Sequence, residues 1–229
     1  MDSFLVSNLK SLIIFGHLSG LAFGVGGAWI LDLYILRKMY KYPITKENIQ
    51  IIKFVSKVVS VGLVILWLSG LSFLVFYIFF QPELLLNHKI WAKLTIVIIL
   101  SINGYYLHQY VIPVIVNNKN KVLINTISLK QANIITLVGC VSCITWPTAM
   151  FLGVFKSLNF SFSVTEILSF YLAALICALG AAFALKSYLV EKEMDLRIKK
   201  LNKHLLESKQ RQALLQQDIK SLIKLLKPL

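Results

Sequence analysis

Long apolar stretches separated by short polar ones dominate the chain up to residue 185. Five of these stretches exceed the roughly eighteen residues, nearly free of charge, that mark a membrane-spanning helix. They cover residues 12–36, 58–80, 90–116, 132–155 and 164–185. The pattern predicts an all-α polytopic membrane protein whose five transmembrane helices form a domain over residues 1–186.

Residues 187–229 follow a different pattern, in which one stripe of positions recurs in alternating steps of four and three. This is the heptad spacing of a coiled coil, and neither glycine nor proline interrupts it before Pro228. We expect a cytoplasmic coiled coil that continues from the fifth span and joins copies of the chain into a parallel homo-oligomer. The alternative is an amphipathic helix lying on the inner leaflet. The stripe consists of Met194, Ile198, Leu201, Leu205, Ser208, Gln212, Leu215, Ile219, Leu222 and Leu226.

The distribution of charge adds an orientation to this picture. The chain carries 24 Lys and Arg against 10 Asp and Glu. Only Lys10, Lys89, Lys93 and Lys156 lie outside the two connections after the first and third spans and the tail. Because basic segments remain in the cytoplasm, we expect a bacterial inner-membrane protein with its N-terminus outside and its C-terminus cytoplasmic. Topology thus accounts for the basic surplus, and we expect contact with membrane lipid and no binding of nucleic acid.

The three cysteines, Cys140, Cys143 and Cys177, all lie within the fourth and fifth spans. Three cysteines cannot all pair within one chain, and none lies in an outward-facing loop, so they do not form a disulfide framework. Although Cys140 and Cys143 form a C-x-x-C pattern, we interpret them as small apolar packing residues.

Four ionisable residues lie at membrane depth, where charge is costly and usually functional. His17 and Asp32 belong to the first span, and Lys93 and His108 belong to the third. The two residues of each span are separated by about 22 Å of helical rise and lie on one broad face. Both spans run from outside to inside. We therefore expect His17 to lie beside Lys93 (the outer pair) and Asp32 to lie beside His108 (the inner pair).

Small residues recur at every fourth position next to His17, in the segment "GHLSGLAFGVGGAW". The ridge of Gly16, Gly20, Gly24 and Ala28 either lets another helix approach closely or leaves room for a flat ring. Two chemistries suit the histidine beside it, namely axial ligation of haem iron and a station in a proton or ion pathway.

The depths of the two histidines exclude one simple haem arrangement. His17 and His108 differ in depth by roughly 15 Å or more, so they do not ligate the same iron. A purely structural role is a further alternative. In it, Lys93 extends to the outer interface, and Asp32 and His108 serve as polar partners for each other.

Two stretches, "GHLSGLAFGVGGAWILDLYILR" and "HKIWAKLTIVIILSINGYYLHQYVIP", resemble bacterial membrane proteins of the HemJ type, the haem-associated protoporphyrinogen oxidases. They are also similar to CopD-type copper-resistance domains. In the HemJ type, a histidine early in the first span and a lysine early in the third are the functional pair, which His17 and Lys93 match. The HemJ type has only four spans and no coiled-coil tail, and "GVGGAWILD" replaces its aromatic and proline-arginine pattern. The resemblance implies haem or porphyrin binding more than porphyrinogen oxidation.

The leading hypothesis is a b-type cytochrome-like protein that binds haem b for redox chemistry or sensing. His17 would be the axial iron ligand, Lys93 a second ligand or propionate partner, and Gly20 and Gly24 the lining of the macrocycle. One rival is an oligomeric proton or ion channel or transport subunit, in which the inner pair lines the pathway. Another is a scaffold or assembly subunit whose coiled coil recruits a cytoplasmic protein partner. The sequence leaves open whether the chain is an enzyme.

Overall fold

The computed structural model describes the backbone of residues 3–226. It describes their side chains too, except those of residues 3, 39–41, 189–190, 192–193, 196–197, 217 and 220–226. The described residues form helices and no strand, apart from one isolated bridge between Pro43 and Val122. The chain divides into two units, Met1–Gly180 and Ala181–Leu229.

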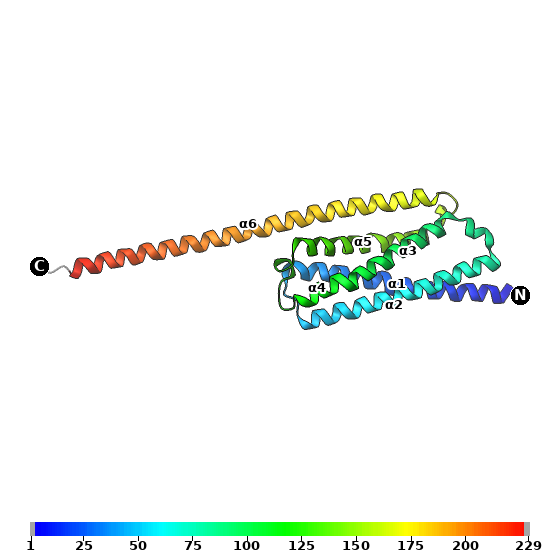
Figure 1. Ribbon diagram of the computed structural model, residues 1–229, viewed down its shortest axis with the longest axis horizontal. Coiled ribbons are helices and arrows are strands. Elements are labelled where there is room, and N and C mark those ends of the chain that lie inside the picture. Colours follow the sequence, from blue (N-terminus) through cyan, green and yellow to red (C-terminus); the bar gives the residue numbers. More distant parts are fainter. Residues whose placement is uncertain (1–2, 227–229) are drawn as a thin grey trace. The chain divides into compact units, whose positions relative to one another are not determined.

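The first unit is a bundle made of α1 to α5 and the beginning of α6 (Figure 1). Short 3-10 segments occur in its connections, and a π-helical turn joins α3 to α4. The elements in chain order are α1 (Ser3–Lys41), α2 (Lys46–Phe80), η1 (Pro82–Leu86), α3 (His88–Tyr106), the π turn η2 (Leu107–Val111), α4 (Ile112–Asn117), η3 (Leu123–Asn125), α5 (Leu129–Val154), η4 (Lys156–Leu158) and α6 (Val164–Leu226).

Five helical segments are long and apolar enough to cross a membrane, which confirms the predicted number. They are Phe4–Lys38, Lys46–Phe80, His88–Asn117, Leu129–Val154 and Val164–Tyr188.

The second of these segments begins earlier than its apolar run predicted. The Thr45 side chain accepts a hydrogen bond from the Asn48 backbone N–H and caps the helix there. Its first turns bury Ile49 and Ile52 in the apolar cluster around Leu31, so the helix extends through the polar residues that precede the apolar run.

The surface of the bundle is rich in exposed large apolar side chains. Phe15, Leu33, Leu68, Phe79 and Phe170 are each between 64% and 74% exposed in the single chain. Water-soluble monomers rarely expose apolar surface on this scale, whereas lipid is a suitable solvent for it.

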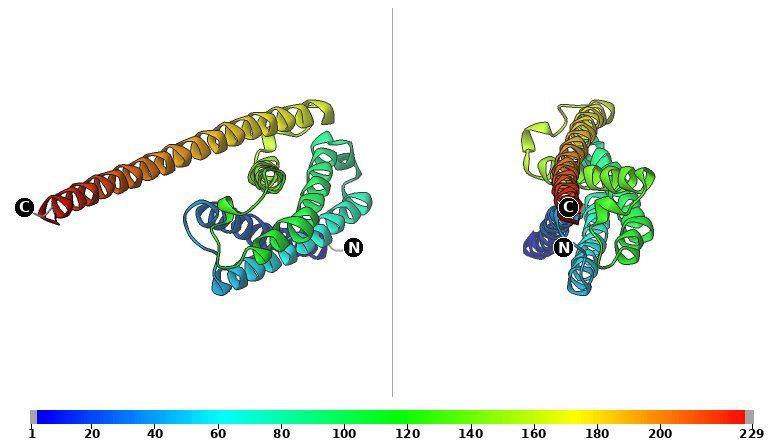
Figure 2. Two further views of the ribbon diagram at one scale, coloured as in Figure 1. Left: turned by 60° about the vertical axis from the view of Figure 1, so that its left-hand side comes forward. Right: turned by 90° about the vertical axis from the view of Figure 1, so that its left-hand side faces the viewer.

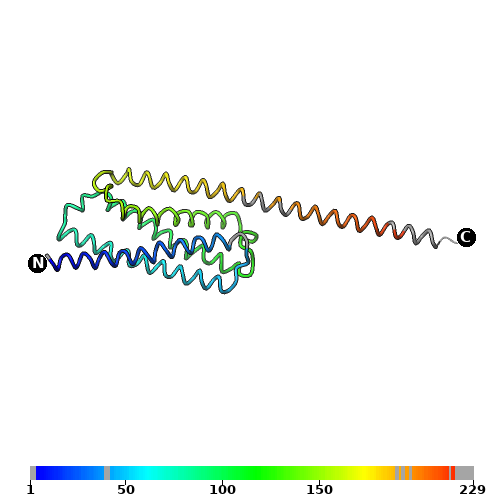
Figure 3. The backbone as a smooth tube through the Cα atoms, turned by 180° about the vertical axis from the view of Figure 1, so that it is seen from behind, coloured from blue at the N-terminus to red at the C-terminus, as the bar shows by residue number. Residues whose placement is uncertain are grey.

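Helices α1 and α2 lie side by side and antiparallel, as Figures 2 and 3 show. Helix α5 packs against both α1 and α3. Three clusters of buried side chains follow one another along the bundle, centred on Leu31 and Ile52, on Leu66 and Trp146, and on Ile96 and Leu152. Polar residues between these clusters are therefore enclosed by several helices at once.

A backbone clamp joins the two connections at the basic end of the bundle. The Ile44 N–H donates to the Lys121 carbonyl (3.1 Å), and the Asn120 N–H donates to the Ile44 carbonyl (2.7 Å). Asn120 has a φ of 64°, which asparagine tolerates better than most residues. The clamp fixes the ends of α1, α2 and α4 at a common level.

Helix α6 runs without interruption from Val164 to Leu226, so the fifth apolar segment and the tail are one helix, as predicted. Within the first unit, the Tyr171 hydroxyl of α6 lies 3.0 Å from the Thr145 hydroxyl of α5, and Ile167 packs into the cluster around Ile96.

Candidate functional site

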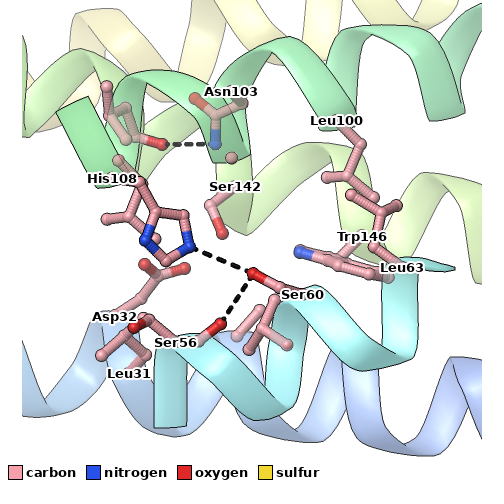
Figure 4. A pocket seen from close by; sticks show the side chains of 15 residues that line it. Leu31, Asp32, Ser56, Ser60, Leu63, Leu100, Asn103, His108, Ser142 and Trp146 are labelled. Carbon is pink, nitrogen blue, oxygen red and sulfur yellow. Dashed lines mark hydrogen bonds between the residues drawn. The ribbon is translucent and has the colours of Figure 1, made fainter. Parts of the chain in front are cut away.

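Asp32 and His108 line the same cavity, between α1, α2, α5 and the π turn (Figure 4). The cavity has a volume of about 40 Å³. This is room for a few water molecules, since one water needs roughly 10–15 Å³ on this measure. The structure thus brings together the two residues of the inner pair, as their spacing predicted. The other lining residues are Ala28, Leu31, Ser56, Val59, Ser60, Leu63, Leu100, Asn103, Gly104, Leu107, Val138, Ser142 and Trp146.

A π-helical turn carries His108. In this turn the Ile112 N–H donates to the Leu107 carbonyl, five residues back instead of four. Pro113 follows directly and lacks the N–H that an α-helix would use, which favours a local change in the hydrogen-bond ladder. The wider turn alters the direction in which His108 projects, and single π turns of this kind occur frequently at functional sites.

The hydrogen bonds of Ser60 couple the protonation of His108 to the direction of one hydroxyl. The Ser60 hydroxyl lies 3.0 Å from the Ser56 carbonyl and 3.0 Å from His108 Nε2. A hydroxyl has a single hydrogen, and the carbonyl can only accept it. In the state in which Ser60 donates to the carbonyl, His108 Nε2–H is the donor to Ser60, and Nδ1 is the nitrogen that can accept or release a proton.

Asp32 stands beside two side chains of α5. The Cys143 thiol donates a long hydrogen bond to Asp32 Oδ2 (3.6 Å), and Ser142 lines the cavity on the same side. The three cysteines are free thiols. Cys143 therefore has a polar partner in addition to the packing role expected for it.

An apolar layer separates the inner pair from the outer pair. Trp146, which is 2% exposed, packs there with Val25 of α1, Leu66 of α2 and Leu100 of α3. On α1 the apolar residue lies between His17 and Asp32, and along α3 and the π turn it lies between Lys93 and His108. On α2, Leu66 lies between Ser60 and Ser69, the serine partners of the two histidines. The apolar layer therefore lies between the cavity and the outer pair.

His17 is held by α2 and lies against an aromatic ring. Its Nδ1 is 2.9 Å from the Ser69 hydroxyl, and its ring meets Phe73 edge-on at 5.5 Å. The Ser69 hydroxyl donates its hydrogen to the Ile65 carbonyl (2.7 Å). In the state in which this hydroxyl hydrogen stays on the carbonyl, His17 Nδ1–H is the donor to Ser69, and in the neutral ring Nε2 keeps its lone pair.

Lys93, the other residue of the outer pair, is half-buried. Within the described part of the chain, neither a hydrogen bond nor an ion pair joins the two residues.

The glycine ridge of α1 packs closely against other parts of the bundle. A Cβ on Gly20 would lie 3.0 Å from the Gly62 carbonyl oxygen, and a Cβ on Gly24 would lie 2.3 Å from the Trp146 ring. Nothing lies within 4 Å of a Cβ on Gly16. Helix α2 and the indole therefore occupy the space beside Gly20 and Gly24, so the ridge itself offers no room for a macrocycle.

The separation of the two histidines can be measured along α2. Their serine partners, Ser60 and Ser69, are nine residues apart in one continuous helix, which is about 13 Å of rise. This agrees with the prediction that His17 and His108 do not share one iron.

The described positions of the heptad stripe are exposed along α6. Met194, Ile198, Leu201, Leu205 and Ile219 are between 50% and 68% exposed in the single chain, and Leu215 is 60% exposed. The side chains of Leu222 and Leu226 lie outside the described residues. The stripe is thus an apolar surface on a continuous helix.

The sequence analysis did not identify several polar residues of the cavity, namely Ser56, Ser60, Asn103 and Ser142. A signal was present for two of them, because Ser56 and Ser60 are four residues apart and so share a face of α2. Their relation to His108 depends on the packing of α2 against the π turn, which the sequence does not reveal.

Comparisons of the chain with protein-family models, curated proteins and solved structures found no match. Among the described residues, no group of three or more His, Cys, Asp and Glu side chains is placed to hold a metal ion.

Proposed function

We propose that this protein translocates protons across a membrane, with the Asp32–His108 cavity as the intramembrane station. The observation that carries the proposal is the shared cavity, in which a carboxylate and an imidazole from different helices face a space for water. Ionisable side chains at membrane depth are costly, and proton relays in membrane proteins commonly consist of such groups.

The arrangement provides the parts of a relay. His108 gives its Nε2–H to Ser60, so its Nδ1 exchanges protons with the cavity, where Asp32 is the acceptor. The apolar layer at Trp146 blocks a continuous water path toward the outer pair. A proton on Asp32 therefore moves onward only when this layer opens, which keeps the membrane from leaking.

Proton flux into proteoliposomes, measured with a pH-sensitive dye in sodium-free buffer, tests the proposal. Asp32→Asn keeps the shape of the side chain but cannot release a proton, and we expect it to abolish the flux. Tyr34→Phe is a matched control on α1, because it removes the hydrogen bond to Asn48 and does not alter the cavity lining. Equal flux in wild type and Asp32→Asn would refute the proposed function.

We propose haem b ligation by His17 as a second function. Its support is the hydrogen bond to Ser69, which fixes the proton on Nδ1 and leaves Nε2 available, the usual arrangement of a metal-ligating histidine. The resemblance to the HemJ type points to the same residue. Because α2 and Trp146 fill the ridge, a macrocycle would lie against another face of His17, and Lys93 would serve as its charged neighbour.

An absorption spectrum of protein purified after expression with haem supply tests this second function. We expect a Soret band that His17→Ala removes and His108→Ala retains. A colourless wild-type protein would contradict haem binding, and a band unchanged in His17→Ala would contradict the ligand assignment.

We propose that the protein lies in a bacterial inner membrane with its C-terminus in the cytoplasm, as the basic connections indicate. There the heptad stripe of α6 pairs with the same stripe of a second copy. Its support is the exposed apolar surface on an uninterrupted helix.

Crosslinking in native membranes tests this pairing. The double variant Ile198→Glu with Leu205→Glu places charge in the seam, and we expect it to lose the crosslinked species. Leu206→Glu is the matched control, since Leu206 is equally exposed but lies off the stripe. Retention of homo-oligomers in the seam variant would contradict the coiled coil, and a crosslink to a different cytoplasmic protein would favour the scaffold alternative.

A further inference from the structure

The polar side chains of α2 in the cavity turn their lone pairs, not their hydrogens, toward it. Ser56 donates its hydroxyl hydrogen to the Lys53 carbonyl (3.0 Å), and Ser60 donates its own to the Ser56 carbonyl (3.0 Å). Each hydroxyl has only one hydrogen, so what remains for the cavity is oxygen lone pairs. The wall formed by α2 is therefore an acceptor surface.

The opposite walls add a carboxylate and a further hydroxyl. Asp32 of α1, when ionised, can only accept hydrogen bonds; it accepts one from the Cys143 thiol of α5, and the Ser142 hydroxyl of α5 lines the cavity beside it. No lysine or arginine is among the residues that line the cavity in the described part of the chain, where His108 is the one other titratable residue of the lining. A single carboxylate thus shares the cavity with several hydroxyl oxygens and has no lysine or arginine as a partner there.

Oxygen ligands suit hard cations, and a single carboxylate balances the charge of a monovalent one. Calcium usually takes more than one carboxylate, and zinc takes clustered His, Cys, Asp or Glu ligands; the described residues hold no such cluster. The volume of about 40 Å³ is enough for a small ion with one or two waters, and far below the roughly 300 Å³ at which organic ligands begin to fit.

We propose that this cavity binds a sodium ion, ligated by the Asp32 carboxylate and by hydroxyl oxygens of Ser60 and Ser142. The ion balances the charge of the Asp32 carboxylate, and His108, which also lines the cavity, keeps its hydrogen bond to Ser60 in the neutral form. The proposal rests on the proposed function because it assigns a second cation to the same intramembrane cavity. Sodium binding and proton transport are nevertheless measured separately.

Equilibrium binding of radioactive sodium to the purified full-length protein, in choline buffer and without a membrane gradient, tests the site. We expect saturable binding to the wild type, no detectable binding to Asp32→Asn, and affinity weakened by about tenfold or more in Ser60→Ala, which corresponds to about 1.4 kcal/mol. Ser72→Ala is the matched control. Ser72 also lies on α2 and donates to the carbonyl four residues back (2.8 Å), but it is exposed and outside the cavity.

Size-exclusion profiles establish that each variant is folded, and Ser142→Ala replaces Asp32→Asn if the latter does not fold. Absence of saturable sodium binding to the wild type would overturn the proposal, as would full binding by Ser60→Ala and Ser142→Ala together. Failure of this inference is distinguishable from failure of the proposed function, because proton flux is measured in sodium-free buffer and sodium binding is measured without flux.

Discussion

The two histidines of the bundle are held in the same way and lie in different surroundings. Each has a ring nitrogen within hydrogen-bonding distance of a serine hydroxyl of α2, and that hydroxyl also lies within reach of a backbone carbonyl four residues back. His108 then faces a cavity that contains a carboxylate, whereas His17 lies against Phe73 with Lys93 as its charged neighbour.

Since both rings contact a serine, the difference in chemistry depends on the ring nitrogen that does not. This nitrogen is Nδ1 in His108 and Nε2 in His17. Nδ1 of His108 reaches a space for water with a proton acceptor across it, which suits proton exchange. Nε2 of His17 has a lone pair in apolar and cationic surroundings, which suit a ligand role.

The replacement of each histidine by alanine should separate the two regions most clearly. We expect His108→Ala to lower proton flux by about tenfold or more, since it removes an acid–base group from the relay. His17→Ala should leave flux within about twofold of wild type, because the apolar layer separates it from the cavity. Proteoliposome flux at equal protein incorporation gives the readout, and an equal loss in both variants would abolish the distinction.

The close contact of α1 and α2 between the two regions should be sensitive to a single methyl group. A Cβ on Gly62 would lie 2.6 Å from the Gly24 backbone nitrogen, so Gly62→Ala forces two helix backbones apart. We expect a loss of about 1–3 kcal/mol, seen as a lower melting temperature in detergent.

Gly70→Ala is the control for this change, since nothing lies within 4 Å of a Cβ there on the same helix. It should leave the melting temperature unchanged or raise it slightly, because alanine has the better helix propensity. Equal destabilisation by both variants would show that helix propensity, and not the contact, governs the effect.

The two serines of α2 should differ in their influence on transport. Ser60→Ala leaves His108 in place but removes its hydrogen-bond acceptor, and we expect flux to fall by about threefold as the ring loses its orientation. Ser69→Ala should change flux by less than the experimental error. If Ser69→Ala lowers flux as much as Ser60→Ala, the outer histidine belongs to the same relay.

The smallest effect is expected from the aromatic neighbour of His17. Phe73→Leu removes the edge-on ring contact but keeps an apolar side chain, so we expect a loss of stability of about 0.5–1.5 kcal/mol and no change in flux. Thermal melting and flux on the same preparation provide the measurements. A flux defect without a change in melting temperature would contradict the purely local role of Phe73.

Much of the architecture could be predicted because it depends on local patterns. Apolar runs of membrane length predicted the five long helices, and the uninterrupted stripe predicted that the fifth continues into the tail. The equal spacing in the first and third spans placed Asp32 at the level of His108, since depth along a helix depends only on the number of residues.

Apolar patterning alone was thus enough for the number of long apolar helices and for the order of the polar residues along each of them, but not for the start of α2. The tertiary structure alone decided which faces meet. It turned His108 toward Ser60 through a π turn, covered Gly24 with Trp146, and added the serines of α2 and α5 to the inner pair. The physical reason is that depth follows from the rise of one helix, whereas the neighbours of a side chain depend on the rotation and packing of several helices at once.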